Sequence, residues 1–314
     1  MKLLGALLLL GAAPDDGSRI PIASPSGVSC VSVIAQVPVV CELHSDRAGD
    51  AIVLEVLVGG ATAWEEAPSV ELDRTRRSAN LFLDLGRVGG LKGGDLVAVR
   101  ARAAGDRAGR SAGEPILLRM LSVEDAETTF QAEAEQLASQ ASEVFEATAD
   151  RVARLGWAER TYGELDALNK TQSAELREFL EAQRSLISSL GEVRAATARF
   201  AVRAACARVL LPEPARRCAL ATRRTGDLLA PGGAAGGAVA RIQEALRAEG
   251  RGARRALLGR AREANERISV VARDLKEVLE ASSIRLSLCA EARRVLRLQD
   301  MRNEELKRLK ELRR

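Results

Sequence analysis

Residues 112–127 read AGEPILLRMLSVEDAE, and this stretch separates two halves of different character. The apolar run over 116–121 has the length and composition of a β-strand. Ser122 is a favourable helix N-cap, and Asp125 stands three residues later, as in a capping box with Asp in place of Glu or Gln. Nearly all of the sequence beyond Ser122 is typical of helix. We therefore predict that a strand passes directly into a helix here, which makes a semi-rigid junction between two modules.

The composition favours a packed protein rich in long helices. The 314 residues allow about two domains, and 46% hydrophobic residues are enough for a core. Only 3% of the residues are aromatic, which is fewer than large globular enzymes usually bury. The 47 basic and 43 acidic residues are interspersed, so the net charge of +4 indicates solvated helix surfaces and no polybasic field.

The half before Ser122 has the pattern of an all-β module. Short alternating or β-branched runs are separated by turn signals such as DRAGD (46–50) and GLKGGD (90–95). The predicted strands lie at 28–36, 37–45, 51–60, 68–73, 78–85, 96–103 and 114–122. About seven short strands at this spacing predict an immunoglobulin-like β-sandwich, although the Cys…Trp…Cys spacing of antibody domains is missing.

The half after Ser122 contains apolar seams with alternating four-three spacing. One predicted helix covers about 122–156, and a second covers about 161–211 and ends at Pro212 and Pro214. The seam of the second helix consists of Leu176, Phe179, Gln183, Leu186, Leu190, Val193, Thr197, Phe200 and Ala204. Its polar members, Gln183 and Thr197, either fix register or partner choice or face solvent at the helix rim.

The remaining helices are interrupted by a glycine-rich stretch. PGGAAGGA (231–238) predicts a flexible break between helices at about 215–229 and 239–249, and a final helix runs from about 253 to the end. Short connections favour helices that fold back on one another as an antiparallel bundle. The alternative for the final helix is a dimerisation arm.

The first thirteen residues, MKLLGALLLLGAA, have one lysine, a short apolar run and small residues, as in a secretory signal peptide. A buried apolar segment is the alternative. We expect an exported protein of the periplasm or cell envelope. Oxidising conditions would then permit disulfides between Cys30 and Cys41 and between Cys206 and Cys218, with Cys289 left unpaired.

No catalytic constellation is apparent in the sequence. The single histidine, His44, stands beside a turn, and no nucleophile-elbow, Walker A, HExxH or GxGxxG context occurs. The glycine-rich segment 89–95 lacks a Ser or Thr after Lys92, so it predicts a hairpin turn instead of a phosphate-binding loop. We expect no enzyme activity, no cofactor and no metal.

Three stretches have a recognisable order of features: a "D-x-x-G, then strand" segment (44–60), an "L-x-x-G-D-x-V, strand, A-x-D, strand-to-helix" passage (80–127) and a late helix pair with a step at Gln299 (271–309). Together they resemble a poorly characterised family of large bacterial envelope proteins, found mainly in planctomycetes and myxobacteria. Members of that family carry an immunoglobulin-like domain followed by extended helices, as a domain of unknown function. The resemblance implies an envelope-associated structural or interaction role.

We therefore predict an α+β multidomain chain with an N-terminal immunoglobulin-like β-sandwich followed by long α-helices in a helical bundle or coiled coil. The predicted segments are a signal peptide (1–13), a linker (14–27), the β-sandwich (28–121), a helical hairpin or bundle (122–230), a Gly-rich linker (231–238) and a helical or coiled-coil segment (239–314).

The predicted function is that of a non-enzymatic, exported scaffold. It would bind protein partners, including a second copy of itself, through helix seams and sandwich loops. The alternative is binding to nucleic acid or to an anionic membrane surface through arginine-rich helices at 215–224, 251–262 and 307–314. Interleaved acidic residues and the scarcity of stacking aromatic residues argue against nucleic acid.

Overall fold

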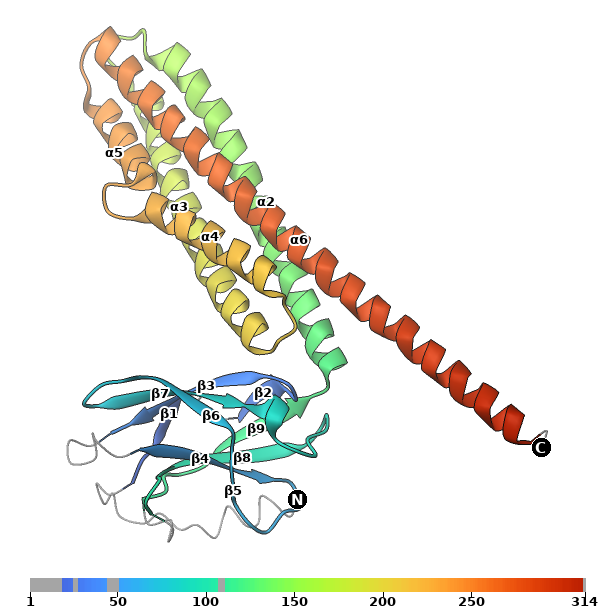
Figure 1. Ribbon diagram of the computed structural model, residues 1–314. Coiled ribbons are helices and arrows are strands. Elements are labelled where there is room, and N and C mark those ends of the chain that lie inside the picture. Colours follow the sequence, from blue (N-terminus) through green and yellow to red (C-terminus); the bar gives the residue numbers. More distant parts are fainter. Residues whose placement is uncertain (1–18, 25–27, 44–50, 107–110, 313–314) are drawn as a thin grey trace. The chain divides into compact units, whose positions relative to one another are not determined.

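The computed structural model describes residues 19–24, 28–43, 51–106 and 111–312, and it is α+β, with a β-sheet region followed by long helices (Figure 1). The chain divides into two compact units. The sheet unit comprises residues 1–128 and 204–209, and the helical unit comprises 129–203 and 210–314. The predicted signal peptide and His44 lie outside the described residues.

The sheet unit consists of two β-sheets. Its strands are β1 (Ile22–Ser24), β2 (Val28–Ser32), β3 (Gln36–Glu42), β4 (Ile52–Val58), β5 (Glu65–Glu66), β6 (Ser69–Arg74), β7 (Ser78–Asp84), β8 (Leu96–Ala103) and β9 (Ile116–Leu121). One sheet has the order β1-β3-β7-β6 and the other the order β2-β9-β8-β4-β5. The pairing of β2 with β9 is parallel, and the other pairings between these strands are antiparallel.

The two sheets share a hydrophobic core, because one cluster of buried residues draws on both of them. Strand β7 alternates strictly, so that Leu81 and Leu83 are buried while their neighbours are half-exposed. Leu85 follows them into the core from a short 3-10 turn (Leu85–Arg87), as the period of two predicts. From the other sheet, Leu54 and Leu118 are fully buried.

The strand prediction was incomplete at the sheet edges. Strand β1 lies inside the segment 14–27, which was predicted to be a linker, and it pairs with β3. Strand β5 has only two residues and pairs with β4, between the predicted strands. Edge strands tolerate Pro, Ser and charged residues because one side of the strand needs no ladder partner, so their sequences look like loops.

A buried carboxylate binds two arginines on the outer face of β4. Glu55 accepts a hydrogen bond from Arg102 Nε at 2.5 Å and one from Arg100 Nε at 2.8 Å. Arg102 also bonds Glu66 of β5 at 2.6 Å, and Arg100 lies 4.1 Å from the ring centroid of Trp64. Burial opposes the ionisation of Glu55, but the hydrogen bonds from the two guanidinium groups outweigh it and lower the pKa of this carboxyl.

The glycine-rich turn before β8 packs against the junction at Ser122. Met120 N donates to Asp95 O at 2.8 Å, and Gly94 N donates to Met120 O at 2.9 Å. A Cβ atom at Gly93 would lie 2.9 Å from Ser122 N, so only glycine permits this close approach. The segment 89–95 is thus a turn, but the predicted hairpin was wrong, because the strands on either side of it, β7 and β8, belong to different sheets.

The helices are α2 (Val123–Tyr162), α3 (Lys170–Cys206), α4 (Pro212–Leu229), α5 (Ala234–Arg247) and α6 (Arg251–Leu312). Helix α2 begins directly after Ser122, whose Oγ accepts a hydrogen bond from Asp125 N at 3.0 Å and donates to the Asp125 carboxylate at 2.6 Å. Figure 1 shows that α2 and α3 run in opposite directions and that α4 and α5 follow one another. Helix α6 then runs back in the direction of α3.

The boundary between the first two helices differs from the prediction. Helix α2 continues through Gly156 to Tyr162, because Leu155 and Tyr162 are both buried in the helical core. Helix α3 begins only at Lys170, where Asn169 acts as the cap. Asn169 Oδ1 accepts from Gln172 N at 2.8 Å, and Asn169 N donates to Gln172 Oε1 at 3.0 Å. This reciprocal capping box was not recognised in the sequence.

Proline and glycine mark helix starts where the sequence analysis placed interruptions. Pro212, expected to terminate a helix, is the first residue of α4, a position where its missing N–H costs nothing. Helix α5 begins at Ala234, inside the predicted Gly-rich linker 231–238. The break between α4 and α5 therefore comprises only residues 230–233. Ala235 and Ala238 are buried in α5, and this burial offsets the low helix propensity of the neighbouring glycines.

One hydrophobic cluster joins α2, α3, α5 and α6. Its buried members are Leu155, Ala158, Tyr162, Leu176, Leu180, Ile242, Ala245, Leu258 and Ala261. The Tyr162 hydroxyl donates to the Glu175 carboxylate, which links α2 to α3.

Arg254 of α6 is almost completely buried, and its hydrogen bonds link α6 to the C-terminal ends of α2 and α5. Its guanidinium donates to the backbone carbonyls of Leu165 at 2.6 Å, of Ala245 at 3.3 Å and of Ala248, and more weakly to that of Tyr162 at 3.5 Å. Since the carbonyls at helix C-termini lack partners within the helix, this single side chain satisfies the ends of α2 and α5 together.

Candidate interaction surfaces

The seam predicted in the second helix is buried within the helical unit. Leu176, Leu190 and Phe200 of α3 are fully buried, Leu186 and Val193 are buried, and Phe179 is half-buried. Across from α3, Phe130 of α2 meets Phe200 edge to face, with 6.1 Å between ring centroids. The chain itself covers this seam, so the seam is not an exposed surface of the folded helical unit.

The two polar seam residues are also buried, which rules out the solvent-facing alternative. Thr197 Oγ1 donates to the carbonyl of Val193 at 2.8 Å, one turn back in the helix. The amide of Gln183 has neither its Nε2 nor its Oε1 hydrogen-bonded. An unbonded buried amide destabilises a fold by about 1–3 kcal/mol, so Gln183 lowers the stability of the helical unit.

All five cysteines are free thiols, so neither predicted disulfide is present. Cys30 is exposed on β2, whereas Cys41 is fully buried on β3 of the other sheet. Burial raises the pKa of the Cys41 thiol to about 12, which leaves it protonated and unreactive. Cys218 is buried with its Sγ 3.6 Å from the hydroxyl of Ser282 in α6, and Cys206 is half-buried at the end of α3.

Helix α6 has two apolar faces, and its own unit covers only one of them. Leu275, Leu279 and Leu286 are buried against the rest of the helical unit. Ile284 and Leu288 each lie two residues from Leu286, which turns them to the opposite side of the helix. They are 60% and 64% exposed, so this second face has no cover.

The exposed face continues along the C-terminal part of α6, where none of residues 287–311 is buried. We call this part the α6 arm, and we call the apolar side chains on one side of it, together with Ile284 just before it, the arm stripe. The arm stripe consists of Ile284, Leu288, Val295, Leu298, Leu306 and Leu309, each between 45% and 64% exposed. The four-three spacing runs from Ile284 through Glu291 to Arg302 and then shifts by one residue to reach Leu306, so two opposite charges occupy positions within the stripe.

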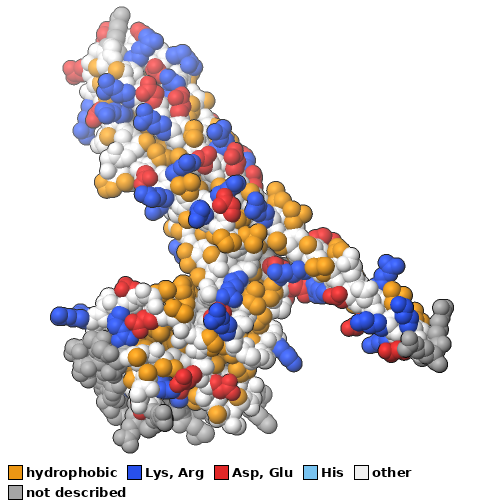
Figure 2. Space-filling model, viewed as in Figure 1, with side chains coloured by type: hydrophobic (Ala, Val, Ile, Leu, Met, Phe, Trp, Pro, Cys, Tyr) orange, Lys and Arg blue, Asp and Glu red, His pale blue; other side chains and the backbone are white. Residues whose placement is uncertain are grey.

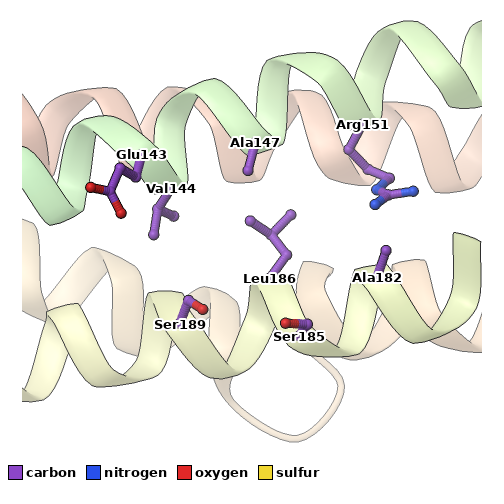
Figure 3. Close-up of a pocket in the computed structure, with 8 residues that line it drawn as sticks. All are labelled: Glu143, Val144, Ala147, Arg151, Ala182, Ser185, Leu186 and Ser189. Carbon is purple, nitrogen blue, oxygen red and sulfur yellow. The ribbon is translucent and has the colours of Figure 1, made fainter.

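A groove with a volume of about 320 Å³ lies between α2 and α3. Figure 3 shows its lining, with Val144, Ala147 and Arg151 on α2 and Ala182, Ser185 and Leu186 on α3. The remaining lining residues are Glu143 and Ser189. The groove therefore has apolar walls, hydroxyl groups on one helix, and charges of opposite sign near its two ends.

Arg151 is the unusual member of this groove. It is 8% exposed, and its Nε and Nη1 atoms are buried without a hydrogen-bond partner. Its guanidinium carbon lies 5.7 Å from the ring centroid of Phe179. Burial lowers the pKa of the Arg151 guanidinium, and the neighbouring Arg154 adds to this effect. The sequence offered no signal for Arg151, because arginines are frequent on all of the helices.

Several arginines of the predicted basic segments 215–224 and 251–262 pair with acidic residues. In the segment 251–262, Arg254 is buried, Arg255 pairs with Glu164 at 2.6 Å and Arg262 pairs with Glu159 at 3.0 Å. Figure 2 shows Lys or Arg and Asp or Glu side chains mixed over the visible face of the helices. This mixing leaves no uniformly basic surface on that face.

Other kinds of site find little support in the described part of the chain. Its residues include no group of three or more His, Cys, Asp or Glu side chains placed to hold a metal ion. Among the helices within the described ranges, none has the length and apolar character that a membrane crossing requires. No protein-family model matches the chain, and no curated protein matches it significantly.

Proposed function

We propose that the chain is a non-enzymatic, exported scaffold of the cell envelope, in which an immunoglobulin-like sandwich and a helical bundle carry the α6 arm to a second copy of the same chain. The observation that carries the proposal is the arm stripe: six apolar side chains, each 45–64% exposed, on one side of a helix that its own unit leaves uncovered. A stripe of this kind is a typical docking surface for another helix.

The strand order supports an immunoglobulin-like assignment for the sheet unit. The order β1-β3-β7-β6 corresponds to strands A, B, E and D of that fold, and β4-β8-β9 corresponds to C, F and G. Strand β5 beside β4 takes the place of C′ in a variable-type domain. Such a domain offers loops and a sheet surface for recognition but no preformed catalytic pocket.

The charges in the arm stripe favour an antiparallel pair of arms. If two arms pair about a point between residues 296 and 297, Glu291 of each chain faces Arg302 of the other. The same register sets Val295 opposite Leu298 and Ile284 opposite Leu309. Leu288 meets Glu305 in this register, with the apolar Leu306 beside it. A parallel pair would instead place Glu291 against Glu291 and Arg302 against Arg302, which costs free energy.

The length of the arm is adequate for such a pair. From Ile284 to Leu309 the helix extends about 38 Å, or between three and four heptads. Every pairing in the stripe repeats by symmetry, as in a two-fold dimer whose partners present the same patch. The seam of α3 has no part in this dimer, because it is already covered within the helical unit.

Charge reversal in the full-length chain tests the pairing. We expect light scattering after size exclusion to show a dimer, and either Glu291→Arg or Arg302→Glu to weaken it by about tenfold or more, because each change creates two like-charge contacts per dimer. The double variant restores the opposite charges and should restore the dimer. Glu304→Arg, on the other side of the helix, is the matched control and should leave the dimer unchanged. A monomeric wild-type chain, or a double variant no better than the single ones, would refute the antiparallel pair.

The envelope location is tested separately by fractionation of the native host and immunoblotting. A shortened form in the periplasm or envelope is the expected result. Full-length chain in the cytosol would contradict export, and the arginine-rich helices should then be tested on nucleic acid.

A further inference from the structure

The groove between α2 and α3 holds a buried cation that makes no hydrogen bond through two of its nitrogens. Arg151 is more than nine-tenths buried, and two of its three guanidinium nitrogens are enclosed without a hydrogen-bond partner. The acid nearest in sequence, Asp150, is paired with Arg154 at 2.8 Å. The contact of Arg151 with Phe179, at 5.7 Å from the ring centroid, satisfies no N–H group.

Burial of the Arg151 guanidinium in this position destabilises the folded chain when no ligand is bound. A guanidinium withdrawn from water loses its hydration, and the loss is recovered only when an anion or several acceptors replace the water. Figure 3 shows the Arg151 side chain extending from α2 into the space that separates it from α3. The guanidinium therefore lies where a ligand in the groove meets it.

The other residues around the groove define what such a ligand looks like. Val144, Ala147 and Leu186 provide apolar walls, and the hydroxyl groups of Ser185 and Ser189 lie along the α3 side. Arg151 is the one basic residue among the eight that line the groove. Glu143 lies eight residues earlier on α2, about 12 Å along the helix axis.

We propose that this groove binds a small organic carboxylate with a short apolar tail. The carboxylate would accept hydrogen bonds from the Arg151 guanidinium, which matches the two oxygens of a carboxylate in geometry. The tail would lie along Val144, Ala147 and Leu186 toward Glu143. A single cation, with a carboxylate at the other end of the groove, selects a monoanion over a phosphate dianion. A volume of about 320 Å³ is at the lower end for ligand pockets, so the ligand is small.

This site is distinct from the proposed dimerisation through α6, and the two are tested by different measurements. Octanoate is the probe for the groove, measured by calorimetry and by the thermal unfolding midpoint of the full-length chain. Acetate, which has the charge without the tail, and octanol, which has the tail without the charge, are the comparison compounds. We expect octanoate to bind and raise the midpoint, and acetate and octanol to bind at least about tenfold more weakly.

Two variants separate the charge from the cavity. Arg151→Gln should raise the midpoint of the unliganded chain, because it removes an unpaired buried charge, and should weaken octanoate binding by about tenfold or more. Ser185→Leu narrows the groove without touching Arg151 and should also weaken binding. Arg160→Gln, at an exposed site on the same helix, is the matched control and should bind octanoate as wild type does. The proposal is overturned if wild type does not bind octanoate, if octanol binds equally well, or if Arg151→Gln retains the affinity.

Discussion

Replacement of Arg254 by methionine should destabilise the helical unit far more than the replacement of any exposed arginine. Methionine has a similar length but no donors, so the carbonyls of Leu165, Ala248, Ala245 and Tyr162 would lose their common partner. The bonds at 3.3 and 3.5 Å are weak, and the two shorter ones dominate the effect.

The expected size follows from those two bonds. A hydrogen bond to a charged group contributes about 1.5–3 kcal/mol, so two of them account for about 3–6 kcal/mol. The methionine side chain recovers part of this, because it fills the same space and no charge has to be desolvated. We therefore expect Arg254→Met to lower the free energy of unfolding by about 3 kcal/mol.

Urea unfolding of the full-length chain, followed by far-UV circular dichroism, is the suitable assay because the signal comes mainly from the helices. The adjacent Arg255 provides the control. It pairs with Glu164, and both side chains are more than half exposed, so Arg255→Met should change the free energy of unfolding by no more than about 0.5 kcal/mol. If Arg254→Met loses no more than its neighbour does, the shared role of Arg254 at the ends of α2 and α5 is refuted.

Three further changes test other parts of the molecule. Leu190→Ala should lower the free energy of unfolding by about 2–5 kcal/mol, measured in urea, because Leu190 is fully buried in the α3 seam. Gln183→Met should act in the opposite direction and raise it by about 1 kcal/mol, because it removes an unbonded amide; a loss of stability would show that Gln183 has a partner. The pKa of Glu55 is lowered in the folded state by Arg102 and Arg100, so its contribution is present above the unfolded pKa and is lost as pH falls through the folded value. Glu55→Gln should therefore be less stable than wild type at about pH 7, and the difference should shrink at about pH 3; a difference independent of pH would contradict the ion pair.

Local patterns were sufficient for the elements with a strong periodic signal. The alternation in 78–85 predicted the buried row of Leu81 and Leu83, because a strand repeats every two residues regardless of its neighbours. Likewise, Ser122 and Asp125 specify a helix start through their own side chains, and α2 begins at the next residue. The order of a β half and a helical half was therefore predictable.

Elements that depend on distant partners could not be predicted in this way. Strand β1 forms because β3 offers a free edge, although its own sequence resembles a linker. Helix α2 passes Gly156 because its next turns are buried against other helices, which outweighs the local cost of glycine. The disulfide predictions were wrong for the same reason, since the positions of Cys30 and Cys41 in sequence say nothing about which sheet each strand joins.

For the two candidate sites as well, the sequence shows the spacing of the residues, and the packing decides their exposure. The four-three spacing of Ile284, Leu288, Val295 and Leu298 can be recognised in the sequence. The same spacing occurs in α3, however, where the seam is buried. Only the packing of the helices decides that one stripe is covered and the other exposed, because burial depends on which surfaces meet and not on periodicity. Arg151 likewise differs from the other arginines only through the two helices that enclose it. The sequence by itself thus determined the strands and helices that have a strong periodic or capping signal, and the tertiary structure decided the remaining elements and which faces remain available to bind.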